Sequence, residues 1–301
     1  MSRISEMLGS RYPVIQGAMG VICNPELVAA VSEAGGFGLL ATAFAEDPEM
    51  VRDEVRRTKE LTDNPFGANL FVMNPLAAKF AEVLAEEGIR AVTVSAGSPK
   101  ELIPLLHDKC VKVIVVVSAV NAARGAEAAG ADAIVAEGAE SGGVQGFQGI
   151  STMVLVPSVV DAVNVPVIAA GGIGDSRGYR AAMALGAQGV QVGTRFIATK
   201  ECIANGIYKN TIVEVGEFGT GLVNMGRFQI RALRTPLAEK MIKGEKGPDN
   251  IFTPAALKEA WIKGDLEAGV LAAGQISGSV HDILSVREVI EEMVDGEKRS
   301  P

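Results

Sequence analysis

The stretch Pro166-Val-Ile-Ala-Ala-Gly-Gly-Ile-Gly174 and the nearby stretch Gly189-Val-Gln-Val-Gly-Thr-Arg195 decide the fold of this chain. Each contains a short run of mostly apolar residues that ends abruptly in glycine. Such a run is typical of a strand that is buried on both faces, as in a parallel sheet. The residues between the two stretches, 176–185, form a helix-like segment that ends before Gly186. The pattern therefore indicates two parallel strands joined by a helix.

The same unit of strand and helix recurs along most of the chain. The predicted strands are short apolar runs, at Pro13–Gln16, Phe37–Ala41, Phe66–Phe71, Ala91–Ser95, Val111–Val117, Ala133–Ala136, Val167–Ala170 and Gly189–Val192. The predicted helices alternate with them, at Pro25–Ala34, Pro48–Leu61, Pro75–Glu87, Pro99–Asp108, Ala119–Ala129, Thr152–Val163 and Ser176–Leu185. Several of these helices begin with proline and end before glycine, as helix termini commonly do.

This alternation predicts an α/β fold, a (β/α)8 TIM barrel with a mostly helical insertion near the C-terminus. An open doubly wound sheet is the alternative, but no GxGxxG motif follows the first predicted strand. We assign residues 1–198 and 283–296 to the barrel and residues 199–282 to a helical and loop insertion that shapes the substrate pocket. A last helix is expected at Leu284–Val294, and the tail 297–301 is expected to fray.

Composition excludes several classes of protein. The 301 residues carry a net charge of −8 without a basic stripe, so nucleic acid is not an expected partner. The apolar runs are strand-sized and the N-terminus lacks a signal peptide, so we expect no membrane segment and a cytoplasmic location. The isolated cysteines (Cys23, Cys110, Cys202) and the two distant histidines (His107, His281) predict no metal site. The expected partner is a small-molecule substrate, and the expected assembly is a homodimer.

The glycines after the last two predicted strands point to a phosphate site. Backbone N–H groups in a glycine-rich turn can converge on one phosphate, because no Cβ blocks the approach. In barrels of this kind the loops after strands 7 and 8 are the recurring phosphate site. We therefore predict that Gly171, Gly172, Gly193 and Thr194 hold a phosphate, although the glycine pair alone could simply form a tight turn. Arg195 either assists or pairs with an acid outside the barrel.

The ordered set of motifs gives the chain a family resemblance. It resembles the nitronate monooxygenase and FMN-dependent enoyl-ACP reductase (type II) family. The motifs that carry the resemblance cover most of the chain: Tyr12-Pro-Val-Ile-Gln-Gly-Ala-Met19, Ser32-Glu-Ala-Gly-Gly-Phe-Gly38, Leu61-Thr-Asp-Asn-Pro-Phe-Gly-Ala-Asn69, Gly130-Ala-Asp-Ala-Ile-Val-Ala-Glu-Gly138, Pro166–Gly174, Gln191-Val-Gly-Thr-Arg-Phe196, Leu233-Arg-Thr-Pro236 and Ala273-Gly-Gln275. The resemblance implies an FMN cofactor in the barrel mouth, with NAD(P)H as a possible electron donor.

The resemblance also assigns roles to residues at the predicted strand ends. It places Gly17, Ala18 and Met19 behind the flavin ring, Asn69 at its polar edge or ribityl chain, Gly142 and Gly143 close to the ring, Glu137 at the ribityl hydroxyls, and Gly171, Gly172, Gly193 and Thr194 at the phosphate. Simpler roles stay open for three of them. Met19 can be a core residue of the barrel mouth, Asn69 a strand-end cap, and Glu137 one half of a salt bridge. Gln145 and Gln275 are expected to border the substrate pocket.

The chain departs from the family at its catalytic residue. The family usually has histidine after the two glycines that follow strand 6, whereas this chain reads Ser141-Gly-Gly-Val-Gln145. Val144 carries no proton, so the catalytic residue is unknown and Gln145 is a candidate polar group. Hydride transfer and nitronate oxidation can proceed without a protein acid, but enoyl reduction needs a proton, and losing the acid typically costs ~10²–10⁴-fold.

We therefore expect an FMN-dependent oxidoreductase that resembles nitronate monooxygenase. One alternative is an FMN-dependent enoyl-ACP or enoyl-CoA reductase that uses NAD(P)H. Another is a flavin-binding protein of low intrinsic catalysis. The last is a barrel that binds a different phosphate ligand, such as an isomerase or a lyase.

Overall fold

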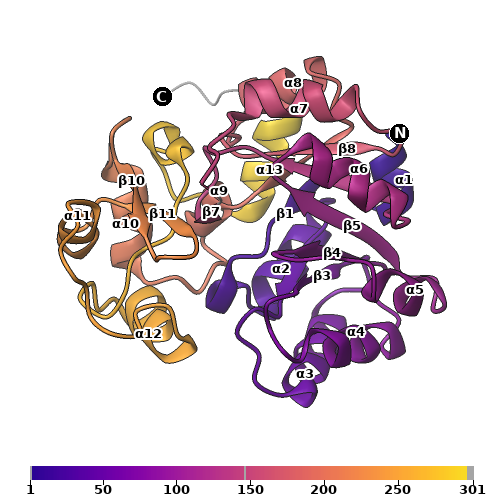
Figure 1. Cartoon of the computed structure of the whole chain (residues 1–301), viewed down its shortest axis with the longest axis horizontal. Coiled ribbons are helices and arrows are strands. Elements are labelled where there is room, and N and C mark those ends of the chain that lie inside the picture. Colours follow the sequence, from indigo (N-terminus) through magenta and orange to yellow (C-terminus); the bar gives the residue numbers. More distant parts are fainter. Residues whose placement is uncertain (1, 146, 297–301) are drawn as a thin grey trace.

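The computed structural model of the protein describes residues 2–145 and 147–296. Eight parallel strands form one sheet in the order β1-β9-β8-β6-β5-β4-β3-β2. Their bounds are β1 Val14–Gln16, β2 Leu39–Ala41, β3 Gly67–Phe71, β4 Ala91–Ser95, β5 Lys112–Val117, β6 Ala133–Glu137, β8 Val167–Ala170 and β9 Gly189–Val192. A parallel bridge between Ile15 and Phe37 joins the first strand to the start of the second, which closes the barrel. The predicted TIM barrel and all eight predicted strands are confirmed (Figure 1).

Helices alternate with these strands as the sequence predicts. Their bounds are α2 Pro25–Glu33, α3 Pro48–Leu61, α4 Ala77–Glu86, α5 Leu102–His107, α6 Val120–Ala128, α7 Thr152–Val160, α8 Ser176–Ala184, α9 Thr194–Ile197 and α13 Val286–Asp295. The predictions for α4, α5 and α7 were too long by up to a turn. Helix α13 starts in a capping box, because Ser285 accepts from the Glu288 backbone while the Glu288 side chain bonds back to the cap. The tail 297–301, predicted to fray, lies outside the described residues.

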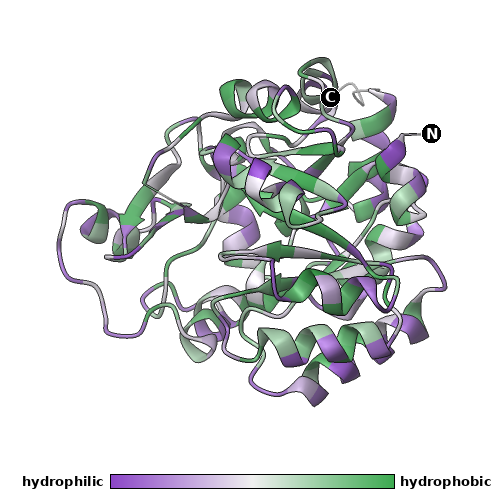
Figure 2. Cartoon of the chain, turned by 45° about the vertical axis from the view of Figure 1, so that its right-hand side comes forward, coloured by the Kyte–Doolittle hydropathy of each residue, from purple (hydrophilic) through white to green (hydrophobic). Residues whose placement is uncertain are grey.

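The interior of the barrel is packed and closed at the N-terminal ends of the strands. Helix α1, Arg3–Leu8, was not predicted, and its Ile4 and Leu8 lie in one buried cluster with Ile15, Phe37 and other residues that point inward from the strands. Two strands present glycine to this interior. A Cβ at Gly67 would lie 2.8 Å from the Phe37 ring, and one at Gly189 would lie 3.2 Å from Ile4. A second, larger core fills the space between strands and helices. In Figure 2 the strands of the barrel are coloured mostly as hydrophobic.

Residues between α9 and α13 form further elements beside the barrel (Figure 1). They are α10 Gly206–Glu214, β10 Thr220–Asn224, β11 Gln229–Leu233, α11 Pro236–Ile242, α12 Pro254–Lys258, a π-helix at Glu259–Lys263 and a 3-10 helix at Gln275–Ser279. The hairpin of β10 and β11 was not predicted. It pairs with β7, Gly143–Gln145, in the loop that follows β6, so it reaches the barrel mouth. Within the described residues no helix is both long and apolar enough to cross a membrane.

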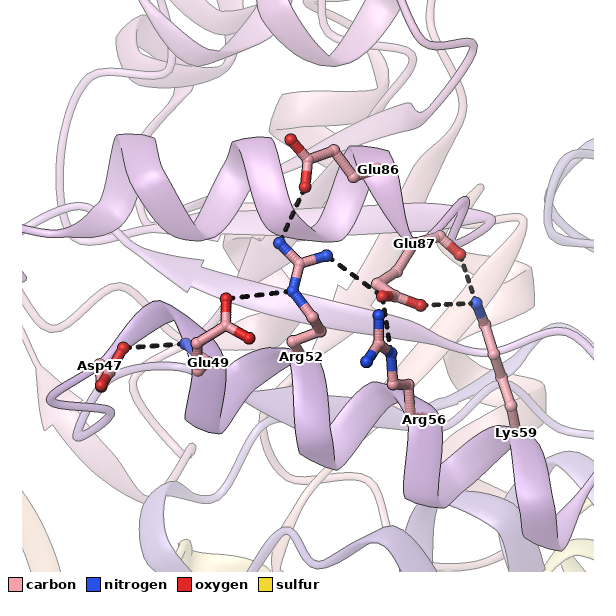
Figure 3. Close-up of polar contacts among 7 residues, drawn as sticks. All are labelled: Asp47, Glu49, Arg52, Arg56, Lys59, Glu86 and Glu87. Carbon is pink, nitrogen blue, oxygen red and sulfur yellow. Dashed lines mark hydrogen bonds and ion pairs between the residues drawn. The ribbon is translucent and has the colours of Figure 1, made fainter.

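A network of charged side chains joins α3 to the end of α4 (Figure 3). Arg52 contacts Glu49 at 3.2 Å, Glu86 at 2.8 Å and Glu87 at 3.2 Å. Glu87 also bonds to Arg56 at 3.0 Å and to Lys59 at 3.1 Å. Two carboxylates at a helix C-terminus are unfavourable because that end carries partial negative charge. The three cations of α3 compensate for this and fix the two helices against each other.

Candidate active site

A cavity of about 370 Å³ lies at the C-terminal ends of the barrel strands. Its walls include nearly every residue that the sequence analysis assigned to a site: Gly17, Ala18, Met19, Asn69, Glu137, Gly142, Gly143, Val144, Gln145, Gly171, Gly172, Gly193 and Thr194. Gln275 is the exception. Its side chain is exposed and only its neighbours Gly274 and Ile276 border the cavity. Residues at the C-terminal ends of all eight barrel strands line this one chamber, as expected for a barrel active site.

The glycine pair after β8 adopts a conformation that other residues rarely reach. Gly171 has φ +98° and Gly172 has φ +71°. A Cβ at Gly171 would lie 2.8 Å from the Gly138 carbonyl oxygen, so the turn also needs glycine for close packing. The backbone N–H groups of Gly171 and Gly172 donate to no other described residue. They are available to a ligand at the cavity wall.

The next strand end completes this wall. Gly193 has an ordinary backbone conformation, and a Cβ there would meet no chain atom closer than 3.9 Å. Packing within the chain therefore does not explain the glycine, whereas keeping the cavity open does. Thr194 accepts from the Gly274 N–H at 2.9 Å, and its hydroxyl proton bonds to no described residue. The turn after β8 and the start of α9 thus leave several hydrogen-bond donors for an anionic ligand.

Neither Arg195 nor the first turn of α8 supplies free donors to this wall. Arg195 does not face the cavity, because its guanidinium pairs with Asp282 at 2.7 Å on the outside of the barrel. The first turn of α8 is also occupied, since Asp175 accepts from the N–H groups of Arg177 and Gly178. Among the described residues no lysine or arginine lines the cavity. Any anion there is held by neutral N–H and O–H donors.

The ends of β1 and β3 form the opposite side of the chamber. The Met19 backbone N–H donates to the Cys23 sulfur at 2.8 Å, and the Met19 side chain both borders the cavity and packs on the core. Asn69 is buried, and its Nδ2 donates to Thr93 Oγ1 at 2.9 Å and to Ser95 Oγ at 3.2 Å. Asn69 thus ties β3 to the neighbouring strand β4, and its position on the wall keeps a ligand contact open.

The loop after β6 is held in place by the unpredicted hairpin. Val144 pairs in register with Ile230, and Gly143 pairs with Arg231. The Arg231 side chain donates to the Ala139 carbonyl at 3.0 Å. A Cβ at Gly142 would lie 2.6 Å from the Ala273 backbone, so this glycine is needed for close packing. Val144 thus lies on a paired strand at the cavity wall, and Gly146 beyond it lies outside the described residues.

Glu137, at the end of β6, is a carboxyl group without a cation. Among the described residues no lysine or arginine pairs with it, which removes the salt-bridge alternative. Burial raises the pKa of Glu137 to about 7, and a hydrogen bond with the Ser141 side chain opposes that shift. At neutral pH a large fraction of this side chain is therefore an uncharged acid.

Several wall residues were missed by sequence reasoning. Two aromatic pairs line the outer part of the cavity: Phe44 with Phe252, ring centres 5.4 Å apart, and Tyr208 with Trp261, 5.9 Å apart. Phe44 follows the end of β2, so it could have been predicted by the rule that residues after the barrel strands form the site. The other three come from residues 199–282, where no local pattern marks a cavity wall.

Gln191 was quoted only as part of a motif, and it is a polar residue inside an apolar strand. It lines the cavity, and its Oε1 is buried without a hydrogen bond to a described residue. A buried acceptor normally has a donor. Its orphaned state is consistent with a wall that receives a polar ligand.

Neither histidine borders this chamber. His107 ends α5 and contacts Asp132 at 2.8 Å, and His281 is exposed. Within the described residues no group of three histidine, cysteine or acidic side chains could hold a metal ion.

A TIM barrel whose cavity lies at the C-terminal ends of its strands has the architecture of a barrel enzyme. A family model described as nitronate monooxygenase matches residues 1–296, so the chain belongs to the nitronate monooxygenase family. FabK from Thermotoga maritima has a similar structure, with a TM-score of 0.91 and 39% identity over 98% of this chain and 95% of that one. Nitroalkane oxidase from Streptomyces ansochromogenes follows with a TM-score of 0.84 and 29% identity over 97% of this chain and 96% of that one.

A curated relative acts on a coenzyme A thioester by name. It is the (3aS,4S,5R,7aS)-5-hydroxy-7a-methyl-1-oxo-octahydro-1H-indene-4-carboxyl-CoA dehydrogenase of Rhodococcus jostii (strain RHA1). That protein is 33% identical, and the match covers 97% of this chain and 94% of the relative. The family membership predicted from the sequence is confirmed.

Proposed function

We propose that the protein is an FMN-dependent oxidoreductase. The observation that carries the proposal is the cavity wall at Gly171, Gly172, Gly193 and Thr194. There two backbone N–H groups and one hydroxyl proton have no partner among the described residues, and a Cβ at Gly193 would meet open space. A flavin phosphate fits such a wall, because neutral N–H and O–H donors can hold a phosphate without a basic residue. The unsatisfied Gln191 acceptor and the polar end of Asn69 would face the polar atoms of the same ligand.

FMN supplies hydride and single-electron chemistry that amino acid side chains lack. The chain supplies its binding and alignment. Met19 and Ala18 provide an apolar surface at one side of the chamber, and Gly143, with no chain atom near its missing Cβ, leaves space at the other. NAD(P)H is the electron donor we propose for the reductive reaction.

Two substrate classes remain in this proposal, and each has its own support. Nitronates are the substrates that the family name suggests. Enoyl thioesters are favoured by the 39% identity to FabK and by the aromatic wall of Phe44, Tyr208, Phe252 and Trp261, which suits an acyl group. A flavin-binding protein with little catalysis is the third possibility. Oxidation of NAD(P)H by the purified protein, with a nitronate, an enoyl thioester or neither, separates the three.

The cofactor proposal is tested by placing a larger side chain at Gly193, on the proposed phosphate-binding wall. The Gly193→Val substitution places methyl groups in the open space, and we expect FMN to bind at least ~100-fold more weakly, which is about 2.7 kcal/mol. The apo protein should unfold at nearly the wild-type temperature. Gly125→Ala is the matched control, because Gly125 also has open space around it but lies on α6 away from the cavity. Titration of FMN followed by its visible spectrum measures both, and wild-type affinity in Gly193→Val would contradict the proposal.

A further inference from the structure

The chamber lacks the histidine of the family but contains another acid. Glu137 lies at the C-terminal end of β6, borders the cavity and has no cationic partner among the described residues. Its one polar side-chain neighbour is Ser141, four residues along the same loop. A carboxyl group buried without a cation is costly in its charged form. Such a group persists in its neutral form, which carries a proton.

Ser141 lies beside this acid on the cavity wall and takes part in a defined hydrogen-bond arrangement. Gln145 Nε2 donates to Ser141 Oγ at 2.5 Å and to the Ser141 carbonyl at 3.1 Å. A hydroxyl oxygen has two acceptor sites and one proton. When Glu137 is protonated, Gln145 and Glu137 fill both acceptor sites of Ser141. The Ser141 proton is then left for a group in the cavity, whose wall Ser141 also lines.

The other titratable side chains in the described part of the wall are engaged. The Tyr208 hydroxyl donates to the Ala272 carbonyl. Glu140 accepts from the Thr152 backbone N–H and hydroxyl at the start of α7, so it acts as a capping carboxylate. Val144 has no proton to give. No histidine, lysine or arginine belongs to the lining.

We propose that Glu137, acting through Ser141, supplies the proton that the family histidine would otherwise give. This inference rests on the proposed function, and it concerns reduction of an enoyl thioester by reduced nicotinamide. The double bond gains at its β-carbon a hydride that originates from NAD(P)H, which is oxidised to NAD(P)⁺, and the α-carbon takes the Ser141 hydroxyl proton. The Ser141 oxygen takes the Glu137 proton in the same motion. Glu137 is left as a carboxylate, and water restores its proton after product leaves.

The pH dependence follows from the groups around Glu137. Burial raises the pKa of Glu137 to about 7, so the acid form is lost as pH rises through neutrality. The other titratable side chains on the wall are Glu140 and Tyr208, and the charge near Glu140 is that of Arg231. The strands on either side, β5 and β8, place no charged side chain at this end. Proton-dependent turnover should therefore fall above about pH 7.

The matched variants are Glu137→Gln and Glu54→Gln. Burial also raises the pKa of Glu54 to about 7, but Glu54 lies on α3 and does not border the cavity. The first readout needs no cofactor: the infrared band of a protonated carboxyl group, followed from pH 5 to 8 in the apo protein. We expect Glu137→Gln to remove one of two such titrations and Glu54→Gln to remove the other.

The second readout divides the reaction. In FMN-loaded Glu137→Gln, reoxidation of the reduced flavin by ferricyanide, which needs no carbon protonation, serves as the internal reference for that variant. Reoxidation by an enoyl thioester should slow ~100-fold or more and lose its fall above pH 7. Ser141→Ala should behave likewise, Ser141→Thr should retain activity, and Glu54→Gln should match wild type.

Two results would overturn the inference, and they are distinguishable. A wild-type protein that binds no FMN removes the proposed function and this inference together. A wild type that oxidises NAD(P)H, with Glu137→Gln keeping a normal rate and pH profile toward the enoyl thioester, removes only the proton donor.

Discussion

Two glutamates of the barrel, Glu87 and Glu137, have opposite surroundings, and their pKa values are shifted in opposite directions. Glu87 follows α4 on the outer face, where Arg52, Arg56 and Lys59 all bond to it (Figure 3). Burial alone would raise the pKa of Glu87, but these hydrogen bonds outweigh it, so its pKa lies below the ordinary value. Glu137 ends β6 in the cavity, where burial is opposed only by Ser141 and its pKa rises to about 7.

The comparison distinguishes Glu87, a carboxylate that stabilises the contact between two helices, from Glu137, an acid that we propose takes part in catalysis. A paired carboxylate stabilises the folded state and has no proton to give at neutral pH. An unpaired buried acid costs stability and keeps its proton, and such groups concentrate at active sites. Both side chains are largely covered, so burial does not distinguish the roles of Glu87 and Glu137. The presence or absence of a cationic partner does.

The largest expected effect on stability is that of Glu137→Gln. A glutamate whose pKa is raised in the folded state lowers the free energy of unfolding of the protein as pH rises from its unfolded pKa near 4.5 to its folded pKa near 7. Over this pH range the side chain ionises freely only in the unfolded chain. The substitution should thus stabilise the apo protein at pH 8, by up to about 3 kcal/mol, and change little at pH 4.5. Urea unfolding at the two pH values measures this. Equal effects at both would show that Glu137 is not held neutral.

A smaller effect of opposite sign is expected for Glu87→Gln. A depressed carboxyl pKa contributes stability that is present above the unfolded value and is lost as pH falls through the folded value. The substitution should cost about 1 kcal/mol at pH 7, since the group is part of a network near the surface. The cost should shrink in ~1 M salt and vanish at low pH. Urea unfolding with and without salt is the measurement, and a salt-independent loss would point to packing instead of charge.

The sequence was sufficient for the barrel because each strand and its helix carry a local pattern. Gly171, Gly172 and Gly193 could be found for the same reason, since glycines at strand ends have a local cause. Glu137 was predicted beside a strand end and the structure has it there, while its flavin contact stays a prediction. Its lack of a cation among the described residues could not be predicted, because that depends on which distant side chains reach it. No spacing of residues in the sequence indicates that a carboxyl group will lack a cationic partner.

The missed features share a long-range origin. The hairpin of β10 and β11 owes its position to pairing with β7, far earlier in the chain. Tyr208 and Trp261 reach the cavity through that part of the fold, and Gln275 is turned outward beside them. The boundary of the insertion at residues 199–282, the cytoplasmic location and the homodimer stay predictions.

The smallest expected effect comes from Glu60→Gln, on the same helix as the cations that hold Glu87. Glu60 contacts Arg57 at 3.0 Å, but the two side chains are 67% and 53% exposed. Solvent screens such a pair, and ordering two long side chains offsets most of the attraction, so the loss should stay below ~0.5 kcal/mol. Urea unfolding beside Glu87→Gln tests this directly. If both substitutions cost the same, the convergence of three cations on Glu87 would add nothing to an ordinary surface pair, and the contrast with Glu137 would have to rest on the cavity alone.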